Sequence, residues 1–312
     1  MLGRRNLRIK VMQALYMWEI DRDVQQVKLD ALLKNQIQRS VGLYLTDLSY
    51  LVEVCKYSMV DKAKRMAKYI KTEEDEKAST TIAANRIVKY LEENEQFNNL
   101  VKKEGIRNYV TDDVVRPLFM ELASKPKYKE YAALQNPDLQ QDKDIIHFIL
   151  KKLLPADSNL EAHLEELFIN YDDDNGLILY ILSKYVDAFT EEKATFFQSL
   201  EVWEEEKKFA FDLLDKTLEH SEELATYIEP NLKNWEMDRV AILDLILMKM
   251  AVCELKYFPT IPVKVSINEY IDISKTYSTP KSKDFVNGVL DKVKNQMQDK
   301  GEIKKFGRGL ME

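Results

Sequence analysis

The stretch VAILDLILMKMAVCEL, residues 240–255, is the most apolar part of the chain and decides what kind of core it has. Apolar residues lie on nearly every side of a helix drawn through it, as is typical of a helix surrounded by other helices. Asp244 and Lys249 interrupt the stretch, which is also shorter than the roughly 18 uncharged residues of a membrane-spanning helix. It therefore predicts a central core helix, with an exposed carboxylate at Asp244 and no membrane contact.

The residues that follow predict two more helices. Pro259 and Pro262 end the core helix and hold an extended link, because each proline restricts the residue before it. Ser266 and Glu269 have the S-x-x-E spacing of a capping box, so a helix is predicted to begin there. A last helix is predicted over about 284–297.

The beginning of the chain has the pattern of an amphipathic helix. Its apolar residues recur at helical spacing and are Leu7, Val11, Ala14, Leu15 and Trp18. Arg4 and Arg8 fall on another face, because residues four apart lie one turn above each other. Met12 and Tyr16 continue on that side. We therefore expect an exposed ridge with cations at one end and an aromatic ring at the other.

Residues 21–200 continue the helical pattern without a repeat of fixed period. Only 8 Gly and 8 Pro occur among 312 residues, well below the average usage of roughly 7% and 5%, which favours long helices. The predicted fold class is all-α. Helices are predicted at 24–39, 41–71, 78–104, 112–123, 142–154, 159–170, 176–189 and 191–206.

Composition argues against most enzyme classes. The chain contains neither GxGxxG nor GxxxxGK[ST], the loops that hold nucleotide phosphates, and no G-x-S-x-G nucleophile elbow. Two cysteines and three scattered histidines offer no disulfide framework and no metal-ligand spacing. The start MLGRRNLRIK lacks the apolar segment of a secretion signal. We therefore expect no enzyme, no cofactor, no metal and a cytoplasmic location.

The net charge of −7 is distributed unevenly. Residues 1–20 and residues 281–312 each carry a net charge of +3, which leaves −13 for the residues between them. An acidic middle repels nucleic acid, so a basic binding surface has to combine the two ends of the chain. The alternative is that both ends are solvated charged tails.

Four short segments resemble the NusB family of transcription antitermination factors. RRNLR at residues 4–8 and QALYMW at residues 13–18 resemble that family's first helix. IPVKVSINE at 261–269 and DFVNGVLDK at 284–292 resemble its P-x-K-V-x-I-N-E and F-V-N-G-V-L-D motifs. The resemblance implies a NusB-like pair of small helical bundles without catalytic activity.

The resemblance also implies partners and the residues that contact them. The family binds the single-stranded boxA element of ribosomal RNA leaders in a heterodimer with the ribosomal protein NusE, and the pair joins the RNA polymerase antitermination complex. Guanidinium groups suit phosphate oxygens, and aromatic rings stack on splayed bases. The implied RNA-binding residues are Arg4, Arg5, Arg8, Lys281, Lys283 and Phe285, and the implied partner-binding residues are Tyr16 and Asp244. Phe285 is alternatively a core residue, in a stripe with Val289 and Val293.

On this reading the chain has four parts. They are the first helix of the NusB-like domain at 1–20, a helical insertion of unknown role at 21–200, the remainder of the domain at 201–298 and a basic tail at 299–312. An insertion of this length is tolerated, because each doubling of loop length costs only about 0.6 kcal/mol. We expect it to be an independently folded helical domain whose ends lie close together, so that the first helix packs against residues 240–297.

Two other functions stay open. A non-enzymatic helical scaffold in ribosomal RNA processing or assembly would bind NusE without RNA. A NusB-like protein associated with an RNA methyltransferase would need a glycine-containing cofactor loop and a catalytic cysteine, and the glycine-poor middle offers neither.

Overall fold

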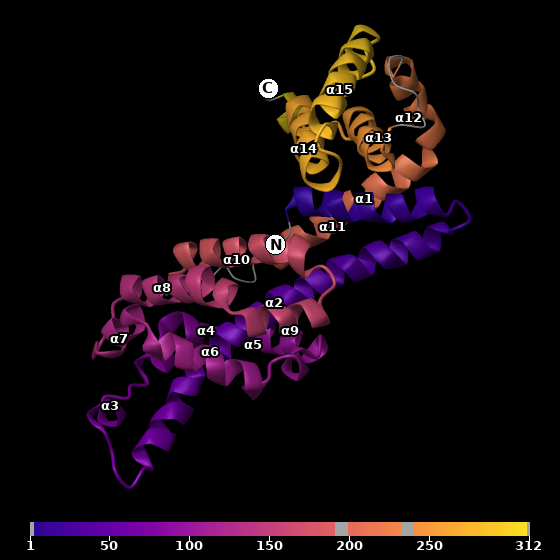
Figure 1. Ribbon diagram of the computed structural model, residues 1–312. Coiled ribbons are helices and arrows are strands. Elements are labelled where there is room, and N and C mark those ends of the chain that lie inside the picture. Colours follow the sequence, from indigo (N-terminus) through magenta and orange to yellow (C-terminus); the bar gives the residue numbers. More distant parts are fainter. Residues whose placement is uncertain (1–2, 191–198, 233–239, 311–312) are drawn as a thin grey trace. The chain divides into compact units, whose positions relative to one another are not determined.

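The computed structural model describes residues 3–190, 199–232 and 240–310. Every regular element in these ranges is helical and no strand occurs in them (Figure 1), which confirms the predicted all-α class. None of the helices in these ranges is both long and apolar enough to cross a membrane.

The chain divides into two compact units. We call Gln38–Val202 the middle unit, and Leu2–Ile37 together with Trp203–Glu312 the terminal unit. The boundary falls inside α2 (Gln26–Met66), a continuous helix of 41 residues where the sequence predicted two helices. Gly42 does not interrupt α2, and an added Cβ there would lie 3.1 Å from the ring of Phe168.

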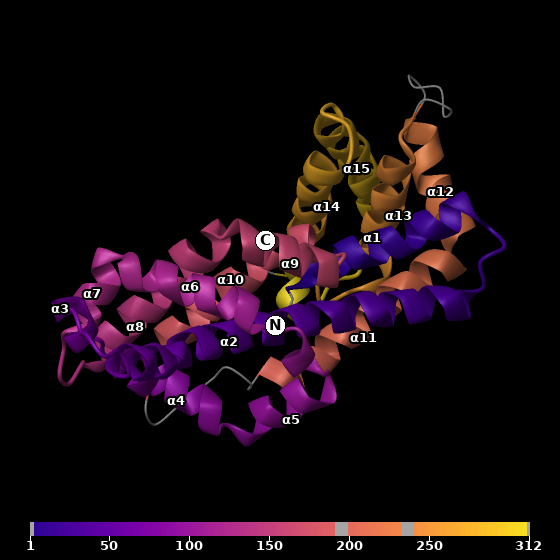
Figure 2. The ribbon, with the colours of Figure 1, turned by 60° about the horizontal axis from the view of Figure 1, so that its bottom comes forward.

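The middle unit packs its helices around one apolar core. In Figure 2, α2 runs alongside the other helices of this unit. The predicted helix 78–104 is interrupted at Asn94, whose side chain accepts a hydrogen bond from Phe97 N at 2.8 Å and caps α5. The helices after α2 are α3 (Glu73–Glu76), α4 (Arg86–Glu93), α5 (Glu95–Lys103), α6 (Asp112–Ser124), α7 (Pro126–Ala132), α8 (Leu139–Phe148), α9 (Ser158–Leu167) and α10 (Tyr171–Ala188).

The terminal unit is built around the predicted core helix, α13 (Ile242–Tyr257). This helix packs against α1, α12, α14 and α15, which Figure 2 shows close to it. The contact with α1 confirms that the first helix meets residues 240–297. The other helices of the unit are α1 (Arg4–Ile20), α11 (Ser199–Glu219), α12 (Ser221–Ile228), α14 (Val263–Tyr277) and α15 (Ser282–Asp299).

Two predictions about this unit are wrong. Asp244 is only 4% exposed, because its Oδ2 accepts a hydrogen bond from Ser282 Oγ (2.7 Å) at the start of α15. Ser266 does not cap α14, because that helix begins directly after Pro262 and Ser266 lies within it. The Ser266 hydroxyl instead donates to the buried carboxylate of Glu254 at 2.6 Å.

Candidate functional site

The first turn of α1 presents two arginines beside acidic side chains of the terminal unit. Arg5 Nε and Nη2 donate to the two carboxylate oxygens of Glu269, both at 2.8 Å, and Nη2 also donates to Asp272 at 2.9 Å. Arg4 Nε donates to Glu206 Oε2 at 2.9 Å. The side chains of Arg4 and Arg5 are still 43% and 49% exposed. Both side chains are therefore open to solvent, and hydrogen bonds to carboxylates fix the orientation of their guanidinium groups.

Arg8, predicted on the same exposed ridge, is buried. Its side chain is 2% exposed and donates to Glu254 from Nε at 2.9 Å and from Nη2 at 2.7 Å. Ser266 and Tyr270 donate to the same carboxylate, so four hydrogen bonds satisfy it. Burial lowers the pKa of Arg8, but the hydrogen bonds and charge of Glu254 outweigh burial and the pKa is raised. Met12 is buried as well, so the predicted ridge is wrong in its middle.

A second group of predicted residues lies at the start of α15. Lys281 and Lys283 are exposed there, and Phe285 is half-buried. The hydrogen bond between Ser282 and Asp244 joins this end of α15 to α13. Lys281 directly precedes α15 and Lys283 lies in its first turn, whereas the exposed arginines lie on α1 of the same unit.

The other end of α1 presents an apolar patch. Tyr16, Met17 and Ile20 are 41%, 38% and 61% exposed. An exposed aromatic side chain with apolar neighbours suits a protein interface. Tyr16 is therefore accessible to a partner, whereas Asp244, predicted to act with it, is covered through its bond to Ser282.

Comparison with known proteins identifies the family of this chain. The NusB family model matches residues 176–295. Proteins named "Transcription antitermination protein NusB" are 43% identical over 106 residues in Chloroherpeton thalassium and 45% identical over 105 residues in Salinibacter ruber. The protein of that name from Bacillus mycoides is 37% identical over 107 residues, which are 34% of this chain and 82% of that protein. The chain belongs to the NusB family.

The match covers only part of the length of each of these relatives. The chain spans 50% of the Chloroherpeton protein and 66% of the Salinibacter protein, in each case with 34% of its own length. No solved structure gives a significant match. The matched residues begin inside α10 and end inside α15, so α1 lies outside them. The ion pair of Arg8 with Glu254 nevertheless joins α1 to the matched helix α13.

Sequence reasoning missed the carboxylates that face the arginines of this NusB-family chain. Glu254 carried a usable signal, because it lies among the apolar residues Val252, Cys253 and Leu255 of the core helix and buried carboxylates are almost always paired. Glu206 and Asp272 carry no such signal, since acidic residues on exposed helix faces are common. Arg308, which lines a cavity with Arg4, was counted only as part of a basic tail.

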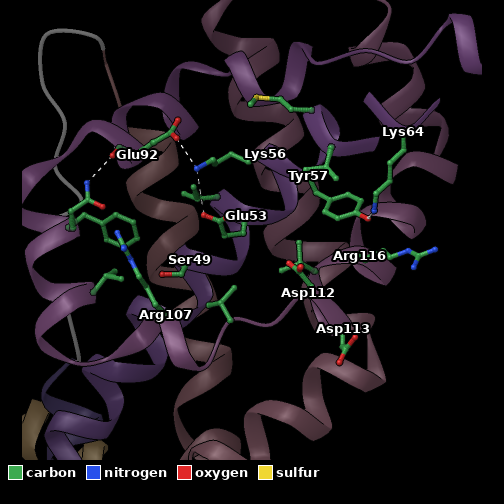
Figure 3. Close-up of a pocket in the computed structure, with 18 residues that line it drawn as sticks. Ser49, Glu53, Lys56, Tyr57, Lys64, Glu92, Arg107, Asp112, Asp113 and Arg116 are labelled. Atoms are coloured by element: carbon green, nitrogen blue, oxygen red, sulfur yellow. Dashed lines mark hydrogen bonds and ion pairs between the residues drawn. The ribbon is translucent and has the colours of Figure 1, made fainter. Parts of the chain in front are cut away.

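The middle unit has a separate groove of about 860 Å³ between α2, α5 and α6 (Figure 3). Lys56 pairs with Glu92 at 2.8 Å and Lys64 Nζ lies 3.2 Å from the Tyr57 hydroxyl. Equal numbers of cations and anions line it, so it favours no charged ligand. They are Lys56, Lys64, Arg107, Arg116, Glu53, Glu92, Asp112 and Asp113. Among the described residues, no cluster of His, Cys, Asp or Glu is arranged to hold a metal ion.

Proposed function

We propose that this chain is an RNA-binding transcription antitermination factor of the cytoplasm. Its ligand is boxA-type single-stranded RNA, and its partners are NusE and the RNA polymerase antitermination complex. The observation that carries the proposal is the first turn of α1, where Arg4 and Arg5 are half-exposed and held in place by carboxylates. Membership of the family, whose relatives are named for antitermination, supports it.

The ion pairs of these arginines do not prevent phosphate binding. Ion pairs that are half-exposed to water contribute only about 0–1 kcal/mol, so a phosphate can compete with the carboxylates. A guanidinium group has five N–H donors, and Glu269 and Asp272 engage Arg5 through Nε and Nη2 only. Arg5 therefore has donors left for a phosphate oxygen.

The remaining predicted residues complete the proposed surface. Lys281 and Lys283 add exposed positive charge at the start of α15, and the half-buried Phe285 is the aromatic residue proposed to contact a base. Arg8 contributes by holding α1 on α13 through its bonds to Glu254. Its guanidinium group itself does not reach solvent.

Titration of labelled RNA with the full chain tests the proposal. A boxA RNA and a scrambled strand of the same composition are compared by fluorescence anisotropy at about 50 and 200 mM salt. We expect tighter binding to the boxA strand and weaker binding of both strands at the higher salt concentration. Equal affinity for the two RNA strands, or an affinity that does not change with salt concentration, would contradict the proposal. Capture of NusE without any RNA binding would favour the scaffold function instead.

Tyr16→Asp is expected to weaken the complex with NusE by about tenfold or more, because it places a charge where an aromatic ring would be buried. The affinity for RNA should stay unchanged, since Tyr16 and Arg4 lie at opposite ends of α1. Isothermal titration with NusE measures the effect. Tyr69→Asp, at a fully exposed tyrosine of the middle unit, is the control. Equal NusE affinity in both variants would rule out this interface.

A further inference from the structure

The C-terminal segment is attached to the terminal unit. Lys305 Nζ donates to the carbonyl oxygens of Glu254 and Phe258, at 3.1 Å and 3.0 Å, and so caps the end of α13. The backbone N–H of Phe306 donates to the carbonyl oxygen of Pro259 at 3.0 Å. These three bonds bring the last described residues back to the link between α13 and α14.

A tight contact then fixes the turn Gly307–Leu310. A Cβ atom at Gly309 would lie 2.3 Å from the carbonyl oxygen of Pro259, so only glycine allows the turn to approach this closely. Arg308 lies within the turn, and its side chain is exposed. Its position is therefore set by the packing of its neighbours.

Arg308 lines an open cavity of about 530 Å³ at the start of α1 and α14. Pro262 and the half-exposed Val265 give the cavity an apolar side, and Ile261, which also lines it, is only 3% exposed. This volume lies within the range of small-ligand pockets. An apolar surface with guanidinium groups at its edge suits one nucleotide of a single strand, whose base needs a flat apolar contact and whose phosphate needs a cation. The cations at the cavity are Arg4, Arg5, Arg8 and Arg308.

These four arginines differ in how far their charge is neutralised. Arg4, Arg5 and Arg8 each form an ion pair with at least one carboxylate at 2.9 Å or less. Arg308 has no carboxylate partner among the residues that the structure describes. Glu269 also lines the cavity, but its carboxylate is engaged by Arg5, so the positive charge of Arg308 is not held in an ion pair.

We propose that Arg308 binds a phosphate of single-stranded RNA, and that the base of that nucleotide lies against Pro262 and Val265. The inference rests on the proposed function and extends it, because it makes the C-terminal turn a part of the RNA-binding surface. The two ends of the chain then meet at one nucleotide subsite.

Arg308→Ala in the full chain tests the inference, with the same labelled boxA RNA and anisotropy readout. At about 50 mM salt we expect RNA affinity to fall on the order of fivefold, and the slope of log affinity against log salt to become shallower by about 0.7. The ratio of wild-type to variant affinity should then shrink about 2.5-fold between about 50 and 200 mM salt. Arg308 is exposed and makes no ion pair in the described residues, so the variant keeps its fold.

Lys304→Ala is the matched control, because it removes one exposed positive charge from the same segment at a residue that does not line the cavity. We expect its affinity and salt slope to stay close to those of the wild type. Equal losses in Arg308→Ala and Lys304→Ala, with wild-type binding intact, would overturn this inference alone. Absence of RNA binding by the wild-type chain would overturn the proposed function and this inference together.

Discussion

Arg8→Ala is expected to lower the free energy of unfolding of the terminal unit by about 3–5 kcal/mol, because it leaves a buried charge without its partner. The carboxylate of Glu254 is fully buried and takes two of its four hydrogen bonds from Arg8. Urea denaturation followed by tryptophan fluorescence measures the change. By sequence, all three tryptophans, Trp18, Trp203 and Trp235, fall within the two segments of the terminal unit and none within Gln38–Val202, so the signal reports on the terminal unit.

Two further variants separate the ion pair from a general effect of losing an arginine. Arg22→Ala removes an exposed arginine of the same unit and should change the free energy of unfolding by less than about 1 kcal/mol. The double variant Arg8→Met with Glu254→Leu removes both charges and should be more stable than Arg8→Ala, because no unpaired charge stays buried. A change below about 1 kcal/mol in Arg8→Ala would show that the pair is solvated.

Reversal of the two exposed charges, Arg4→Glu with Arg5→Glu, is expected to weaken boxA RNA binding on the order of 100-fold at low salt. The double variant loses two proposed phosphate contacts and adds two negative charges next to the bound RNA. The milder Arg4→Gln with Arg5→Gln removes the contacts without adding repulsion from Glu269, and the salt slope should become shallower by about 1.4. Anisotropy titrations over a series of salt concentrations measure both quantities.

The control for these variants changes the same amount of charge elsewhere in the terminal unit. Arg22→Glu with Lys28→Glu reverses two exposed cations beyond the end of α1. We expect it to weaken RNA binding only slightly, through the net charge of the unit. If it weakened binding as much as the reversal at Arg4 and Arg5, the first turn of α1 would hold no specific phosphate site.

The sequence was sufficient to predict the elements whose apolar pattern is strong. The core helix around Leu247 is buried over most of its length, as predicted. The stripe of the first helix is also buried from Leu7 to Leu15, because its spacing matches one helix face. The resemblance to the NusB family rested in part on the motif at 261–269. The helix that begins in this motif, α14, packs against α13.

Two of the errors came from contacts between residues distant in sequence, and a third from a local helix cap. Periodicity put Arg8 on the same face as Arg4, but α1 buries more than one face and Glu254, 246 positions away, accepts from the inner arginine. The break at Asn94 depends on one side-chain cap, which apolar spacing does not reveal. Asp244 was expected at the surface because charged residues usually are, yet Ser282 covers it.

The candidate site was predictable in part. The arginines at the start of α1 were found from charge and resemblance, and their role in RNA binding stays a prediction. Arg308 could not be found, because its position depends on the backbone contact of Gly309 with Pro259.

Ultraviolet crosslinking of boxA RNA to the full chain, with mass spectrometry of the crosslinked peptides, tests the central claim that both ends of the chain form one RNA-binding surface. The account predicts crosslinked peptides from the start of α1, from the link and helix at 261–269, from the start of α15 and from the turn Gly307–Leu310. Crosslinks confined to the middle unit, Gln38–Val202, would contradict it.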